Sequence, residues 1–278
     1  MFKYLLVSYF VLTALVCNVQ PIENTEVVTI VISITTFIFA IILGFSMAER
    51  HSRFSSLKQI FSSIDGLILN SYYASGALGK KVQEQYKKLL DQFLMRQFDY
   101  KVDDFDHLSD DIRGMQEFFW KLPNKNARQN LIIDHALMSL EKVSEYERNV
   151  KYNILNRMAV YEWASLIILA LISLYCLVAL NDGSWIMVIF IPILGTSIIL
   201  LLLVLLMLDK LSWKHGQWMV LPVLDIFKKL NLTPYIVDDM LVSGNITRKS
   251  LKGMKVRVAS FPKSYPNLTG KKVKIVKF

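Results

Sequence analysis

Residues 27–48 read VVTIVISITTFIFAIILGFSMA, a run without a single charged side chain. About 20 apolar residues suffice to cross the hydrocarbon core of a bilayer, where unpaired polar groups cost several kcal/mol. Three further, mostly apolar runs complete two close pairs along the chain. These runs are residues 2–19, 159–180 and 185–208. The sequence therefore predicts a mainly α-helical integral membrane protein with four transmembrane helices.

The first apolar run allows two interpretations. Lys3 followed by an apolar stretch is typical of a cleaved signal peptide as well as of a retained membrane helix. The residues before Asn18, TALVC, do not place small side chains at both positions that a cleavage site needs, which favours a retained helix. Both interpretations leave the placement of the rest of the chain unchanged.

The positions of Lys and Arg predict the orientation of these helices. Short loops rich in Lys and Arg stay cytoplasmic, whereas the two loops within the pairs contain neither residue type. We therefore expect these loops outside the cell, and both termini in the cytoplasm of a cell that carries the protein in its plasma membrane. The part from residue 209 onward contains 14 basic and 4 acidic residues. This excess either binds anionic lipid headgroups or reflects the usual basic character of cytoplasmic segments.

These features divide the chain into four parts. Residues 1–48 contain the first helix pair, residues 49–158 a cytoplasmic helical bundle, residues 159–208 the second pair, and residues 209–278 a basic tail with a helix and a β-hairpin. In the bundle, apolar residues recur at helical spacing on both sides of a break that we expect within residues 71–79.

Two further expectations concern the bundle and the tail. A second long bundle helix is predicted from about residue 126 to residue 154, running without a cap into the third membrane helix. In the tail, we expect a helix at residues 218–230. Alternating residues predict hairpin strands at residues 255–261 and 272–278.

The residues give little support to enzyme or metal chemistry. The four histidines are scattered, and the acidic stretch at residues 103–111 lacks the glycine and glutamate positions of a calcium-binding EF-hand loop. Cys17 and Cys176 lie in predicted membrane segments and offer neither a disulfide framework nor a metal spacing. We therefore expect a protein that is not an enzyme, with no catalytic residue, no metal, no cofactor and no nucleic-acid partner.

Two acidic residues stand at the predicted cytoplasmic ends of the last two membrane helices. These are Glu162 and Asp209. They are expected either to form interfacial ion pairs with Arg157 or Lys210, or to contribute to a site for an ion or a proton.

The second membrane helix carries a stripe of small or polar residues at intervals of three and four, which places them on one side of a helix. The stripe consists of Thr29, Ser33, Thr36, Ala40 and Gly44, with Phe37 and Ile41 beside it. One interpretation is close packing against another helix. The other is a pore-lining surface in a ring of subunits, with Phe37 and Ile41 forming an apolar constriction.

Two motifs resemble the bestrophin-like membrane proteins, distant relatives of the bestrophin anion channels. The first is LGFSMAER at residues 43–50, which runs from the second membrane helix into a long helix. The second is LLMLD at residues 205–209, which closes the fourth. A large cytoplasmic loop of paired helices adds to the resemblance, which covers most of the chain.

The resemblance implies a function. In those channels, five subunits surround an axial anion pathway that is narrowed by apolar residues of the second membrane helix. The matching neighbourhood here would be Ser33, Phe37, Ile41 and Gly44. An acidic calcium clasp after the fourth membrane helix and a proline-aromatic neck sequence are both missing, so calcium gating is not implied.

We therefore expect a homo-oligomeric anion channel whose pore is lined by the second membrane helix, and the resemblance implies a pentamer. The alternative is a non-conducting membrane scaffold or sensor. In that case the cytoplasmic bundle and the basic tail would bind protein or anionic lipid.

Overall fold

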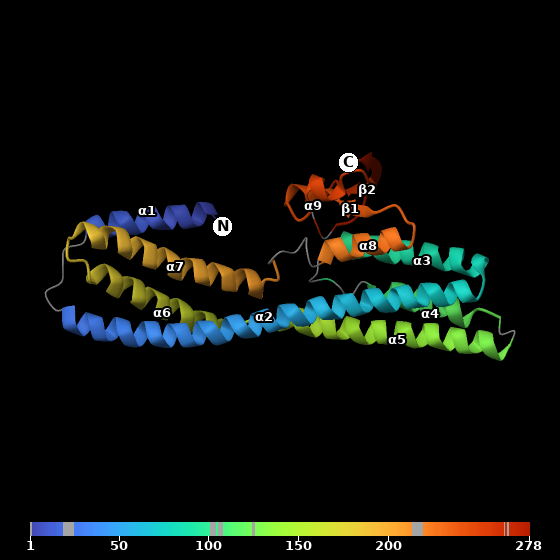
Figure 1. Ribbon diagram of the computed structural model, residues 1–278, viewed down its shortest axis with the longest axis horizontal. Coiled ribbons are helices and arrows are strands. Elements are labelled where there is room, and N and C mark those ends of the chain that lie inside the picture. The colour runs from blue at the N-terminus through green and yellow to red at the C-terminus, as the bar shows by residue number, and fades with distance from the viewer. Residues whose placement is uncertain are drawn as a thin grey trace. The chain divides into compact units, whose positions relative to one another are not determined.

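The computed structural model describes residues 2–18, 25–100, 104, 108–123, 126–212, 219–263, 265 and 267–278. It is mainly helical and ends in a small sheet (Figure 1). The chain separates into two compact units. Met1–Phe54 and Arg157–Trp213 form the first, and Ser55–Asn156 and Lys214–Phe278 form the second. The predicted membrane helices thus fall in one unit, and the bundle and tail fall in the other.

The first unit contains α1 (Phe2–Asn18), the beginning of α2 (Thr25–Ala77), α6 (Val160–Ala179) and α7 (Trp185–Asp209). Three helical stretches are long and apolar enough to cross a membrane, and α1 is apolar but shorter. The four predicted membrane runs therefore form helices, while a fourth membrane crossing by α1 stays a prediction.

Helix α1 packs along α7, as Figure 1 shows, and buries Leu12 and Val16. Gly195 of α7 permits this close approach, since a Cβ atom there would lie 2.7 Å from Leu12 Cδ1 and 3.0 Å from Leu174 Cδ2. The buried Asn181 side chain donates a hydrogen bond of 2.9 Å to the Val16 carbonyl. That carbonyl lies in the last turn of α1, where helices leave acceptors unpaired.

The core of the first unit lies where one face of α2 meets α6 and α7. Buried Phe39 and Leu43 of α2 cluster with Leu166 and Ala170 of α6 and with Leu205 of α7. Phe39 and Leu43 are four residues apart and so share one side of the helix. Further along α2, the apolar residues of this face are followed by the charged residues that come after residue 48.

The second unit contains the rest of α2 together with α3 (Lys80–Asp99), α4 (Ser109–Trp120) and α5 (Ala127–Leu155). Its core includes the fully buried Tyr86, whose hydroxyl lies 2.7 Å from the Ser71 hydroxyl and 3.6 Å from Met115 Sδ. These contacts satisfy a polar group that would otherwise be costly to bury. Helix α5 begins as predicted, because the Asn126 side chain accepts the backbone N–H of Gln129.

The structure narrows one prediction about the bundle and corrects another. Helix α2 runs through most of the predicted break and ends at Ala77, so that the break narrows to the turn at Gly79, whose φ of 129° suits glycine. Helix α5 does not run into α6, because residues 156–159 are not helical. The acidic stretch at residues 103–111 includes the first turn of α4, while residues 101–103 and 105–107 lie outside the described residues.

The tail forms α8 (Leu221–Lys229), β1 (Tyr235–Val237), α9 (Asp238–Val242), the 3-10 helix η3 (Arg248–Leu251), β2 (Lys255–Ser260) and β3 (Lys272–Lys277). Strands β2 and β3 pair antiparallel, which confirms the predicted hairpin. Strand β1, which the sequence analysis missed, pairs parallel with β2.

One face of the sheet lies against α3. Arg257 of β2 forms hydrogen bonds of 2.7 and 2.5 Å with both carboxylate oxygens of Asp91. The Tyr235 hydroxyl donates to Asp99, which also accepts a bond of 2.6 Å from Lys271. Two strands alone are marginally stable in water, so a third strand and a helix beneath them account for the stability of this sheet.

Candidate functional site

Asp209 is the last residue of α7, and its side chain is only 7% exposed. A carboxylate at this end of a helix is unfavourable, because the macrodipole places partial negative charge there. Two residues after the end of the helix, Leu211 adopts a left-handed conformation with φ of 53°. The next residue, Ser212, donates its backbone N–H to the Met207 carbonyl over 3.0 Å. This tight turn fixes the position of Asp209.

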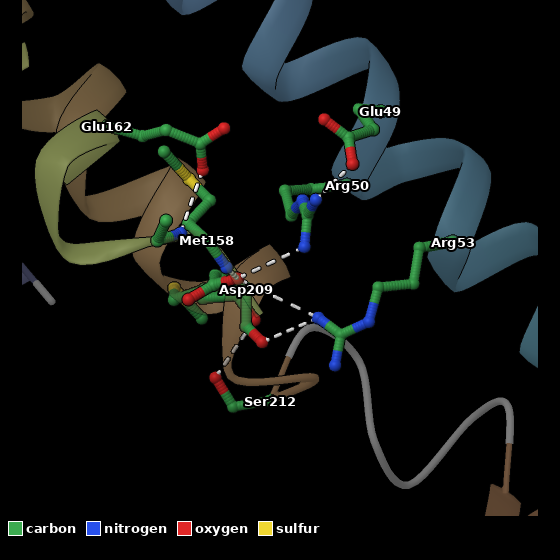
Figure 2. A network of polar contacts seen from close by, with 9 residues as sticks. Glu49, Arg50, Arg53, Met158, Glu162, Asp209 and Ser212 are labelled. Atoms are coloured by element: carbon green, nitrogen blue, oxygen red, sulfur yellow. Dashed lines mark hydrogen bonds and ion pairs between the residues drawn. The ribbon is translucent and has the colours of Figure 1, made fainter. Parts of the chain in front are cut away.

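Two arginines of α2 compensate the buried carboxylate. Nη1 of Arg50 lies 3.6 Å and Nη1 of Arg53 lies 3.7 Å from Asp209 Oδ1 (Figure 2). Arg53 also donates a hydrogen bond of 2.9 Å to the Asp209 carbonyl, which the end of α7 would otherwise leave unpaired. Both arginine side chains are 3% exposed. The two residues are three positions apart, which places them on one side of the helix.

The carboxylate also holds the segment that precedes α6. The backbone N–H of Met158 donates to Asp209 Oδ1 over 2.9 Å. One residue later, the backbone N–H of Ala159 donates to the Glu162 carboxylate over 2.8 Å. Asp209 therefore connects the polar end of α7 to α2 and to the start of α6. We call Arg50, Arg53, Met158 and Asp209 the clamp.

The chemistry of the clamp favours positioning over proton transfer. Guanidinium groups do not lose their proton in proteins, so Arg50 and Arg53 stay charged. Glu49, whose side chain is 60% exposed, forms an ion pair with Arg50, so two acids balance two bases. Within the described part of the chain, no group of three or more His, Cys, Asp or Glu side chains is placed to hold a metal ion.

The structure distributes the predicted charged residues differently from the sequence analysis. Arg157 and Lys210, suggested as partners of the two acids, are both exposed, and Asp209 forms ion pairs with Arg50 and Arg53. Glu162 caps the first turn of α6. Sequence reasoning did not identify the arginines as partners. Their three-residue spacing, on the side of α2 that also carries Leu43, is the signal that was available.

The stripe on α2 lies away from the buried face of the helix. Thr29, Ser33, Ala40 and Gly44 are exposed in the single chain, and Thr36 is partly exposed. The flanking side chains Phe37 and Ile41 are 67% and 42% exposed. The Ser33 hydroxyl donates to the Thr29 carbonyl over 2.7 Å, and the Thr36 hydroxyl donates to the Ile32 carbonyl over 2.6 Å. The hydroxyls are therefore satisfied within the helix.

A family model described as the Bestrophin-like domain matches residues 4–211. The chain belongs to the Bestrophin-like family. The match begins within α1 and ends two residues beyond Asp209, so it includes the stripe and the clamp. The two motifs that carried the resemblance end at Arg50 and Asp209, the residues that the structure pairs. No curated protein and no solved structure matches the chain.

Family membership and the apolar helices together identify a membrane protein related to the bestrophins. The matched region ends before α8 and the sheet. The tail therefore belongs to the part of this Bestrophin-like protein that the family model does not cover.

Proposed function

We propose that the protein is a homo-oligomeric anion channel in which the stripe on α2 lines the pathway. The observation that carries the proposal is the uncovered stripe within a matched Bestrophin-like domain. A pentamer is the arrangement suggested by the resemblance to the bestrophins. The proposal assigns the protein no enzymatic step.

The exposed surface of α2 supports this proposal because a side of small and hydroxyl-bearing residues and an apolar side adjoin each other, with Phe37 and Ile41 at the boundary between them. Ile34, Ile38 and Phe45 are large, apolar and 57%, 40% and 75% exposed, as expected for side chains that face lipid tails. The stripe residues lie on another side of the same helix, with small or hydroxyl-bearing side chains. Small residues at a helix surface allow another backbone to approach closely, and hydroxyls can face water.

The clamp supplies the rigidity that such a helix needs. Arg50 follows the stripe residue Gly44 by six positions, which is about 9 Å along the helix axis. Because Arg50 and Arg53 are fixed by Asp209, the stripe keeps its direction relative to α6 and α7. In the proposed channel, Phe37 and Ile41 form the apolar constriction.

The cellular placement is part of the proposal. The distribution of Lys and Arg supports a plasma-membrane protein with both termini in the cytoplasm. Basic residues near the cytoplasmic mouth would raise the local concentration of small anions.

A second candidate is a non-conducting scaffold or sensor, which the basic tail favours. The tail contains 14 basic and 4 acidic residues, a balance that suits protein or anionic lipid partners. In this alternative, the stripe is a helix-packing surface between subunits.

The experiment that separates the two candidates measures chloride and nitrate flux through the purified protein in liposomes, together with its oligomer mass. Ser33→Trp fills the stripe, whereas the control Ile38→Trp places the same side chain on the apolar side of α2. We expect flux from the wild type and the control, and loss of flux in Ser33→Trp with the oligomer intact. A folded wild-type oligomer without flux would refute conduction and support the scaffold.

Phe37→Ala tests the constriction in the same assay. Removing a large apolar side chain from a narrow pore should increase flux. Unchanged flux would place the constriction elsewhere along the helix.

A further inference from the structure

The sheet of the tail carries a hollow on the face that does not contact α3. Its floor is formed by Val258 of β2 and Val276 of β3, whose side chains alternate with those of Arg257 and Ile275 on the other face. Leu241 of α9 closes one side. The hollow has a volume of about 680 Å³. This volume lies in the range that small-molecule sites in proteins occupy.

Basic residues dominate the rim of the hollow. Arg248 and Lys249 come from η3, Lys252 follows directly after it, and Lys277 ends β3. Asp238 contributes the only carboxylate side chain among the lining residues that the structure describes. Three cationic side chains, those of Arg248, Lys249 and Lys252, against one anionic side chain make the hollow complementary to an anion, whereas alternation along β3 places the Lys277 side chain on the other face with Ile275.

The basic residues on the two faces of the sheet differ in their partners. On the face toward α3, Arg257 pairs with Asp91, and Lys271 pairs with Asp99. Around the hollow, none of the four basic residues forms an ion pair with a carboxylate of the described residues. The like charges of Arg248, Lys249 and Lys252 repel one another, so an anion that neutralises them gains binding free energy.

We propose that this hollow binds the phosphate group of an anionic ligand the size of a phospholipid headgroup. Arg248, Lys249 and Lys252 contact the phosphate oxygens, which arginine and lysine bind through charge-assisted hydrogen bonds. The valine floor accommodates the apolar part that links the phosphate to the rest of the ligand. The site lies beyond the residues matched by the Bestrophin-like domain, and the inference does not depend on anion conduction.

The test titrates the full-length protein in neutral detergent with two probes, dioctanoyl phosphatidylglycerol and glycerol 3-phosphate. The variant Arg248→Gln/Lys249→Gln/Lys252→Gln removes three charges from the rim. The control Lys80→Gln/Lys81→Gln/Lys88→Gln removes three charges from exposed positions of α3. The two triple variants therefore have the same net charge, and far-ultraviolet circular dichroism checks that both remain folded.

We expect at least one probe to bind the wild type and the control, with affinity that falls as salt is added. The rim variant should bind at least about tenfold more weakly, because it loses the three charged side chains that contact the phosphate oxygens. Binding of both probes would show that the phosphate group is sufficient for binding. Binding of the lipid alone would show that the ligand is a lipid. Equal affinities of the two folded triple variants, or no binding of either probe to the wild type, would overturn the proposal.

Discussion

Each unit contains an arginine–aspartate cluster, and the two clusters differ in geometry and burial. In the second unit, Arg257 donates two short hydrogen bonds to Asp91, and the two side chains are 18% and 20% exposed. In the first unit, Arg50 and Arg53 lie 3.6 and 3.7 Å from Asp209 Oδ1, but all three side chains are nearly inaccessible to solvent.

The geometry of an ion pair and its burial therefore affect stability separately. Well-aligned pairs near the surface gain strong hydrogen bonds but compete with water, so their net contribution is modest. Water cannot solvate a buried charge that has lost its partner. Removing one partner of a buried pair therefore costs about 3–5 kcal/mol. We therefore expect the less ideal cluster to be the more costly one to break.

The largest effect is expected for Asp209→Ala, which leaves Arg50 and Arg53 buried without a carboxylate. The first unit should lose about 3–5 kcal/mol of stability. The buried thiol of Cys176 can report its unfolding in detergent through a thiol-reactive dye. All proteins compared carry Cys17→Ser, so that the exposed Cys17 does not react with the dye.

The matched control for this experiment is Lys210→Ala, an exposed neighbour of Asp209 in sequence. It should change stability by no more than about 0.5 kcal/mol. If Asp209→Ala and Lys210→Ala unfolded at the same temperature, burial of the ion pairs would not make the loss of the Asp209 carboxylate costly.

The next effect concerns packing in the first unit without any charge. Gly195→Ala places a methyl group against Leu12 and Leu174, and overpacking of this kind costs about 1–3 kcal/mol. Gly44→Ala is the control, since its new methyl group meets no atom of the chain within 4 Å. The same thiol assay should show destabilisation for Gly195→Ala that Leu12→Ala partly relieves. Equal behaviour of the two alanine variants would show that α1 and α7 do not pack as described.

Arg257→Ala should lower stability by less, about 1–2 kcal/mol, because water can replace some of the hydrogen bonds that the partly exposed Asp91 loses. Arg257→Lys should recover only part of this, since an ammonium group cannot reproduce both hydrogen bonds. Hydrogen exchange of the β2 and α3 amides would measure the local loss. A loss larger than that of Asp209→Ala would reverse the ranking of the two clusters.

The smallest effect is a pH dependence in the second unit. Burial raises the pKa of the Asp111 carboxyl, although the Arg96 guanidinium at 3.0 Å opposes the shift and Asp110 adds to it. An acid with a raised folded-state pKa binds its proton more tightly in the folded protein, so stability falls as pH rises above about 4. Asp111→Asn should weaken the fall of the unfolding temperature as pH rises above about 4. An unchanged slope in this variant would assign the dependence to other groups.

The sequence predicted the apolar helices well because the bilayer imposes a simple rule. Helices α6 and α7 begin and end within one residue of the predicted runs. The hairpin was also predictable, since its residues alternate locally. Strand β1 was not, because three buried residues carry no alternation that distinguishes a strand from a loop.

The clamp could not be predicted from local patterns. Arg53 and Asp209 are 156 residues apart, and nothing in either neighbourhood specifies the other. The interruption before α6 was missed for a related reason. Residues 156–159 contain neither glycine nor proline, and the non-helical backbone is fixed by the bond from Met158 to the distant Asp209 carboxylate.

The clamp also has a mechanical consequence for α2. Successive residues of an α-helix are about 100° apart around its axis, so a twist of α2 by one residue would carry both guanidinium groups away from Asp209. The buried ion pairs therefore oppose torsion of the helix that bears the stripe. A change in the accessibility of the stripe would have to come from bending of α2 or from side-chain rotation, with the turn of α2 that carries Arg50 and Arg53 held in place by Asp209.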